Sequence, residues 1–416
     1  MLERRTGEFP SLLIKETETC DAEKFEAGEA ALSLSLYLNG QETQEIRSVT
    51  HLLDGLMIRD PKRRSISRVL YGEEIVAART GDQIYVLSHK SGKDVQICPQ
   101  MTYGKNSVES AALNTSFFIH QAYEKTQKLL PETHIAPIDL RVGSLVSYEQ
   151  QVPGRRGSIL YSTYDVDNAY YVPQEKSIIF LPHSKKRSGS FAKFWQIPTV
   201  ANHEYGHHIF ASLSPRGVRA GLEGCFGHDH DLIDSAEGRV GTRTARDLET
   251  ALNEGFSDLF AFYSLLPRER SIQGIPELIM TREIHSPFFN NFQMKTFSEE
   301  ALLDFFSPKS ETRIQTHYAI KHSFGAIFAH RANELLESFT LSDERKLYVL
   351  LSWVKEYGKN WSRFQSYEPR TMLDEMLRLF VTTTLGEVKK SLNAETCPKV
   401  IRFYPRFEEL LDECRL

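Results

Sequence analysis

Residues 203–207 read His-Glu-Tyr-Gly-His, a combination of residue types and spacing that suits a metal ion. Residues four apart lie on the same face of an α-helix, so the imidazoles of His203 and His207 can converge on one cation. Glu204 follows the first histidine and can reach a water molecule on the metal, where a carboxylate can act as a general base. The pattern therefore predicts a metal site with a base beside it.

A second segment supplies carboxylates that such a site needs. Residues 243–266 predict a helix, because apolar side chains recur at helical spacing and Pro267 follows. Within it, Glu254 and Asp258 are four residues apart on a face otherwise lined by alanine, and buried carboxylates need partners. Glu254 would complete a His₂Glu zinc site with an open fourth position, and Asp258 would accept the free N–H of a ligand histidine. The alternative is a solvated helix face that carries two acids.

The first motif also needs a helix to hold it. Pro198 suits a first helical turn, apolar residues follow on either side of the motif, and Pro215 comes after the expected end. Gly206 lies inside this helix at a cost of about 1 kcal/mol relative to alanine. A small residue beside a metal is compatible with close packing of another element.

Upstream of these helices the chain predicts mainly strands. Polar and apolar residues alternate over 138–142, a second run covers 158–164, and residues 169–172 and 177–181 are joined by four residues that suggest a hairpin. A helix is expected from near Asn106 to the residue before Pro131, and a strand over 83–87. After Pro198 the chain reads as largely helical.

These elements predict an α+β fold with a β-rich N-terminal lobe, an α-helical C-terminal lobe and the metal site between them. We divide the chain into residues 101–215, which form the β-rich lobe and end in the helix of the first motif, and residues 216–416, which form the helical lobe. Residues 1–100 are expected to be a small mixed α/β region that acts as an accessory unit or as an inhibitory pro-segment. The length of 416 residues suits two or three such units.

Composition excludes several other classes. The net charge of -5, from 50 basic and 55 acidic residues, argues against a nucleic-acid surface. No stretch approaches the roughly 18 consecutive apolar residues of a membrane span. The five cysteines form no C-x-x-C pair, which argues against a cysteine zinc site, but one or two disulfides stay open. The first residues do not form a secretory signal, so either the protein is cytoplasmic or its true start lies upstream.

The two motifs together resemble those of the thermolysin-like zinc metallopeptidases, also called gluzincins. Residues 203–207 match H-E-x-x-H, and residues 253–258 match the downstream N-E-x-x-x-D on a later helix. Residues 168–171, Asn-Ala-Tyr-Tyr, are similar to the edge-strand motif of the family. Residues 322–325, His-Ser-Phe-Gly, are a further match and are expected at the start of a helix. The resemblance covers roughly residues 105–340, by the order of the motifs.

The resemblance implies a two-lobed zinc-peptidase fold and a zinc-dependent endopeptidase. The metal would be Zn²⁺, held by His203, His207 and Glu254, with Glu204 as the general base and Asp258 behind one ligand histidine.

The resemblance also implies residues that bind the substrate and stabilise the transition state. His322 would stabilise the oxyanion, and Asn168 with Ala169 would bind the backbone of a peptide or protein substrate by strand addition. Members of this family also suggest a secreted or periplasmic location, with the cytoplasm as the alternative.

The sequence departs from the family between the two zinc motifs. The gap from His203 to Glu254 is longer than in thermolysin, and no tyrosine lies between residues 211 and 250, where a second transition-state donor is expected. The histidines within residues 228–231 could replace that donor or form a second metal site, but a polar lid loop is the favoured interpretation.

Neighbouring branches of zinc peptidase fit less well. Leu213 stands where metzincins have a third histidine, and no G-x-M-E-N segment marks an aminopeptidase. No acidic residue within 196–200 matches the family's calcium site, so bound calcium is not implied. A rival of another class is a non-catalytic, zinc-stabilised binding protein. Glu204 argues against that rival, because a structural site needs no base.

Overall fold

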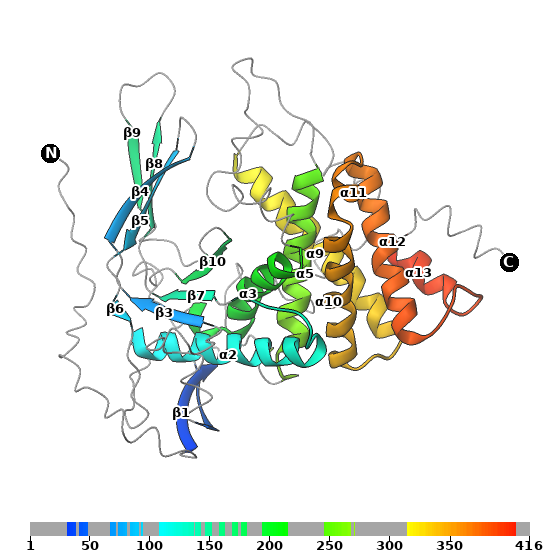
Figure 1. Cartoon of the computed structure of the whole chain (residues 1–416), viewed down its shortest axis with the longest axis horizontal. Coiled ribbons are helices and arrows are strands. Elements are labelled where there is room, and N and C mark those ends of the chain that lie inside the picture. The colour runs from blue at the N-terminus through cyan, green and yellow to red at the C-terminus, as the bar shows by residue number, and fades with distance from the viewer. Residues whose placement is uncertain are drawn as a thin grey trace.

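The computed structural model describes a strand-containing N-terminal half and a helical C-terminal half (Figure 1). The described residues are 31–38, 41–48, 67–71, 74–80, 84–90, 93–94, 108–136, 138–142, 146–151, 158–162, 169–173, 176–180, 194–214, 245–267, 270 and 314–404.

The described strands form three sheets. One is a hairpin of β1 (Ala31–Leu38) and β2 (Gln41–Ser48). The second has the order β10-β11-β7-β3-β6, in which β7 pairs in parallel with both β11 and β3 and the other pairs are antiparallel. Its members are β3 (Ser67–Tyr71), β6 (Lys93–Asp94), β7 (Ile138–Val142), β10 (Ala169–Val172) and β11 (Ser177–Phe180). The third is antiparallel and consists of β4 (Glu74–Thr80), β5 (Ile84–Lys90), β8 (Val146–Gln151) and β9 (Ser158–Ser162).

One long helix, α2 (Val108–Leu129), lies between β6 and β7 in the sequence, and the other described helices follow β11. They are the short 3₁₀ helix η4 (Phe194–Gln196), α3 (Pro198–Leu213), α5 (Ala245–Ser264), α9 (Ile314–Ser338), α10 (Asp343–Lys359), α11 (Trp361–Gln365), α12 (Pro369–Val388) and α13 (Cys397–Phe403). Helix α2 runs beneath α3 in the view of Figure 1 and packs against both α3 and β7.

Several expectations about individual elements are confirmed. The helix that begins at Pro198 is α3, the helix expected over 243–266 is α5, and β10 and β11 form the expected antiparallel hairpin. One expectation is wrong, because His322 does not stand at the start of a helix. The described part of α9 already begins at Ile314, which places His322 in the interior of that helix.

Strands on both sides of residue 100 share the larger sheets. Strand β3 pairs with β7, and β5 pairs with β8, so strands before residue 94 are hydrogen-bonded to strands after residue 138. Every described element before α2 is a strand. A boundary near residue 100 would therefore separate hydrogen-bonded strands, and the division of the chain into three units stays a prediction.

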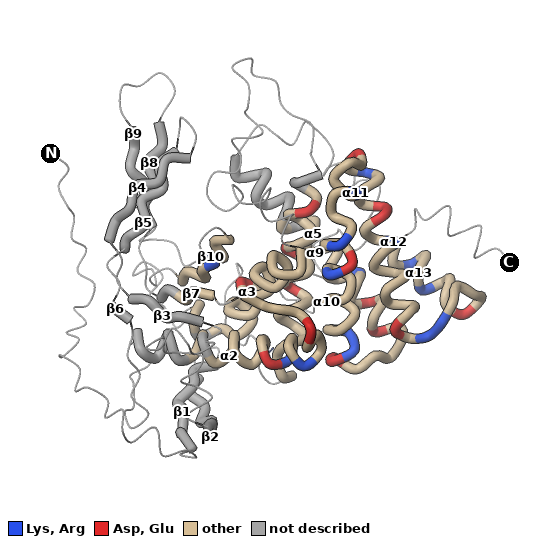
Figure 2. Tube along the Cα trace, in the orientation of Figure 1, with Lys and Arg blue, Asp and Glu red and all other residues tan. Residues whose placement is uncertain are grey.

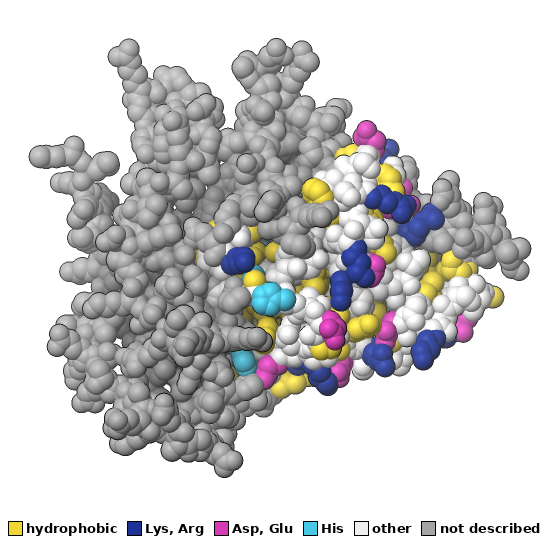
Figure 3. Space-filling view, in the orientation of Figure 1, with side chains coloured by type: hydrophobic (Ala, Val, Ile, Leu, Met, Phe, Trp, Pro, Cys, Tyr) yellow, Lys and Arg dark blue, Asp and Glu magenta, His cyan; other side chains and the backbone are white. Residues whose placement is uncertain are grey.

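Helices α10 to α13 carry charged residues of both signs. In Figure 2 the tube of α10 to α13 carries many basic and acidic residues, and Figure 3 shows both signs interspersed on that face. This mixture is in line with the small net charge of the sequence. None of the helices that the structure describes combines the length and the apolarity that crossing a lipid bilayer requires.

Helix α5 is the central element of the helical half, because it packs against α3 on one side and α9 on the other. Large aromatic side chains fill the contacts: the rings of Phe210 and Phe256 lie 5.5 Å apart, and those of Tyr205 and Phe260 lie 6.2 Å apart. All four side chains are buried. Burial of such rings is a main source of the apolar stabilisation of a core.

Glycines allow α5 and α9 to come unusually close. A Cβ atom on Gly325 would lie 2.5 Å from the carbonyl oxygen of Ala251 and 2.7 Å from Cβ of Glu254, and one on Gly255 would overlap the carbonyl oxygen of Gly325. Backbone atoms cannot yield as a flexible side chain can. The crossing of α5 and α9 therefore requires glycine at both positions.

We expect Gly255→Ala to destabilise the protein by about 1–3 kcal/mol, because the new methyl group has to push two packed helices apart. Gly386, inside α12, is the matched control: a Cβ there would meet nothing within 4 Å. Gly386→Ala should be neutral or stabilise the fold by up to about 1 kcal/mol, since alanine favours helix. Denaturant unfolding of both variants measures this, and equal effects would contradict the close packing of α5 on α9.

Candidate metal centre

Helix α3 carries the first motif through the middle of the core. His203 and Glu204 are each only 3% exposed, and Tyr205 and Gly206 are also buried. Polar groups at such depth need partners, because burying an unpaired polar or charged group is costly. The partners of His203 come from α5.

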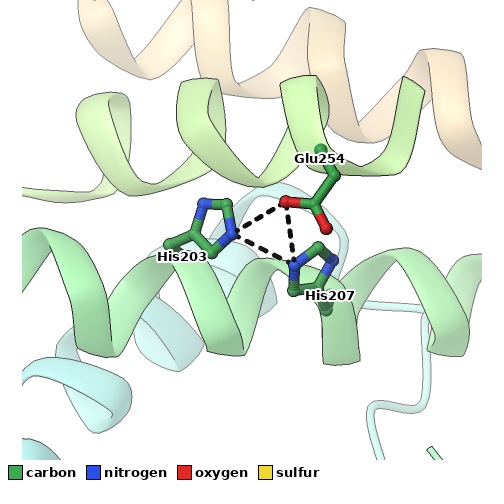
Figure 4. Close-up of side chains that lie close together, drawn as sticks. All are labelled: His203, His207 and Glu254. Atoms are coloured by element: carbon green, nitrogen blue, oxygen red, sulfur yellow. Dashed lines mark hydrogen bonds and ion pairs between the residues drawn. The ribbon is translucent and has the colours of Figure 1, made fainter. Parts of the chain in front are cut away.

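Three side chains from α3 and α5 point at one place (Figure 4). Nε2 of His203 lies 3.1 Å from Nε2 of His207. Oε2 of Glu254 lies 3.3 Å from the first of these nitrogens and 3.7 Å from the second. All three atoms lie within 4.8 Å of one another, and the side chains are only 4% and 13% exposed for the two histidines and 13% for the glutamate. This group can bind a metal ion.

The opposite ring nitrogens of the two histidines also have partners. Oδ1 of Asp258 lies 2.8 Å from Nδ1 of His203, and Oγ of Ser257 lies 3.0 Å from Nδ1 of His207. When each Nδ1–H donates to its oxygen, each Nε2 presents a lone pair to the shared point. Two lone pairs and a carboxylate oxygen so close together repel one another, and a cation between them removes that repulsion. The residues therefore fit a metal ion.

The carboxyl group of Glu254 is held in its metal-binding form. Burial by itself raises the pKa of Glu254. The nearby imidazoles of His322, His207 and His203 lower it by more, so the pKa lies well below its usual value. This lowering comes from the imidazoles in their protonated form, and a bound cation in place of those protons would favour the same ionised carboxylate that metal binding requires.

His322 reaches the same carboxylate from α9. Its Nε2 lies 3.3 Å from Oε2 of Glu254, and its side chain is 21% exposed. His322 is three residues before Gly325, so the two lie on one side of α9, where the helix crosses closest to α5. The structure thus brings His322 to the edge of the three-residue group without making it a member.

The structure describes only some of the other residues that the sequence assigns to the site. Glu204 is buried on α3 between the two ligand histidines, as the sequence requires. Ala169 is the first residue of β10, the last described strand of its sheet, and is buried. Asn168 and the histidine-rich residues 228–231 lie outside the described residues.

Sequence reasoning missed a bridge between β10 and helix α3. The hydroxyl of Tyr171, on β10, lies 3.1 Å from Nδ1 of His208, and Nε2 of His208 donates to the carbonyl oxygen of Ala136 at 2.8 Å. Burial lowers the pKa of His208 to about 4, so this ring is neutral. The bridge fixes the edge strand to the helix one residue after His207. The adjacent histidines 207 and 208 were the only signal for it in the sequence.

Comparison of the chain with protein-family models and with curated proteins found no match. The resemblance to thermolysin-like peptidases therefore depends on the residue motifs alone.

Asp258→Asn should weaken metal binding about 10–100-fold, the usual effect of losing the partner of a ligand histidine. An amide can still accept the N–H of His203, but it has no charge to strengthen that ligand. Zinc affinity measured by competition with a chelator tests this. Asp343→Asn on α10, a change at a partly exposed aspartate far along the chain, is the control and should leave the affinity unchanged. Equal affinities for Asp258→Asn and wild type would separate Asp258 from the metal centre.

Proposed function

We propose that this protein is a zinc-dependent metallopeptidase of the thermolysin-like type, with a two-lobed α+β fold and endopeptidase activity. The observation that carries the proposal is the convergence of two imidazole nitrogens of α3 with one buried carboxylate oxygen of α5. Glu204 lies on α3 directly after the first of these histidines and is buried. Two nitrogen ligands and one oxygen ligand, with a fourth position left open, form the usual set of a catalytic zinc site. A closed structural site would fill that position.

The protein's own residues supply acid, base and positioning groups. When bound, zinc would polarise the scissile carbonyl and activate a water molecule. Glu204 takes a proton from the attacking water and delivers it to the leaving amine. His322 donates a hydrogen bond to the oxyanion of the tetrahedral intermediate. Asn168 and the backbone of Ala169 align the substrate peptide along β10.

The state of one cysteine supports a secreted or periplasmic location within this proposal. Cys397, the first residue of α13, is disulfide-bonded. Disulfides persist in oxidising compartments and are rare in the cytoplasm. The resemblance to secreted zinc peptidases and this disulfide therefore favour the same compartment.

The test of the proposed function is Glu204→Gln. The variant should keep one zinc per chain, because no ligand is removed, and should lose hydrolysis of an unfolded protein substrate by at least about 10²-fold, because the base is gone. Elemental analysis and a peptide-cleavage assay measure the two. Glu132→Gln, at an exposed glutamate, is the control and should behave as wild type. Absence of zinc from wild type, or near-normal turnover by Glu204→Gln, would refute the mechanism.

His322→Ala should retain zinc and lose about 10²–10³ in kcat with little change in KM, since a donor to the oxyanion acts only in the transition state. His317→Ala is the matched control on the same helix. His317 lies five residues earlier on the same helix, and His317→Ala should have little effect. Lost zinc affinity in His322→Ala would instead assign His322 to holding the Glu254 carboxylate. A large kcat loss in His317→Ala alone would transfer the role to His317.

A further inference from the structure

The Nδ1 atoms of His203 and His207 contact different kinds of oxygen on α5. Asp258 offers a carboxylate oxygen to His203, whereas Ser257 offers a neutral hydroxyl to His207. The two supporting residues are consecutive on α5, yet each faces a different ring, because consecutive helical residues are about 100° apart. Ser257 is completely buried.

The place of the Ser257 hydroxyl is set by the backbone of α3. A Cβ atom on Gly206 would lie 2.9 Å from Cα, 3.1 Å from Cβ and 3.1 Å from Oγ of Ser257. Any side chain at position 206 would therefore displace Ser257 from its neighbour His207. This close approach explains why a helix in the core contains a glycine beside the ligand, in spite of the helical propensity that glycine loses.

We propose that Ser257 is a positioning residue of the metal centre, whose hydroxyl accepts the Nδ1–H of His207 and so keeps the Nε2 lone pair directed at the metal. The inference rests on the proposed function of His203, His207 and Glu254 as metal ligands. A neutral imidazole carries one N–H, and the nitrogen that bears it is set by the hydrogen bond available to it. Without the hydroxyl, the Nδ1–H of a largely buried ring loses this acceptor, and the ring loses a restraint on both its tautomer and its rotation.

The arrangement also makes the two ligands unequal. A carboxylate partner increases the basicity of a ligand imidazole. A hydroxyl orients the ring but adds no negative charge. His203 is therefore the stronger electron donor of the pair, and His207 the weaker. The net charge of the centre is therefore one unit more positive than it would be with two carboxylate partners.

The experiment is a comparison of Ser257→Ala with Ser264→Ala on the same helix. Ser264 is an equally buried serine whose hydroxyl bonds to Asn202 and to the carbonyl oxygen of Ala261, away from the ligands. Alanine is smaller than serine and favours helices, so both full-length variants are expected to fold. Zinc affinity, by chelator competition, and the unfolding midpoint of the metal-free protein are measured for each variant.

Ser257→Ala should weaken zinc binding about 10–100-fold, the loss typical for the partner of a ligand histidine. Ser264→Ala should shift the unfolding midpoint but leave zinc affinity unchanged, which distinguishes positioning from a general loss of packing. If the zinc affinity of Ser257→Ala stays within twofold of wild type, the inference about Ser257 is wrong, but the proposed function is unaffected. Wild type that binds no zinc overturns the proposed function itself, and the two failures are therefore distinguishable.

Discussion

A buried carboxylate is the constraint on which the rest of the helical half depends. Glu254 lies inside a bundle of apolar side chains, where an isolated negative charge is strongly disfavoured. Three imidazoles from two other helices surround its oxygen, and together they hold the pKa of Glu254 well below its usual value. Helix α5 can carry this charge through the core when the histidines of α3 and α9 are protonated, or when a cation lies between their nitrogens and the carboxylate.

That requirement explains the glycines at the helix crossings. Side-chain contacts of about 3 Å between helices need backbones that approach closely, and an ordinary Cβ at the crossing prevents it. Gly206 lets α3 meet α5 at Ser257, and Gly255 with Gly325 lets α5 meet α9 beside Glu254. Each of the three glycines lies within three residues of a residue that faces the centre. The lost helical propensity at these positions is offset by the geometry that they permit.

The sequence predicted the features that depend on helical periodicity alone. His203 with His207, and Glu254 with Asp258, are four residues apart, and that spacing places each pair on one face before any tertiary contact is known. Ser257 and His208 could not be found in this way, since their partners are fixed by how α5 and β10 lie against α3. The sequence does not indicate that α9 begins before His322, because the preceding segment contains threonine, histidine and tyrosine, which favour helix only weakly. The sheet pairing of β3 with β7 joins residues about 70 positions apart and left no local signal.

The arrangement of partners implies a site that is assembled by the fold and then filled by the metal. In small zinc domains the ligands lie on segments that order only when the ion binds. Here the ligands lie on two long helices whose aromatic side chains pack together, and the Nδ1 atoms of both ligand histidines face oxygens of α5. The conformational freedom of the ligands is already lost in folding. For an ion that binds here, binding free energy would not be spent on ordering the chain, and three preorganised side chains would suffice to hold it.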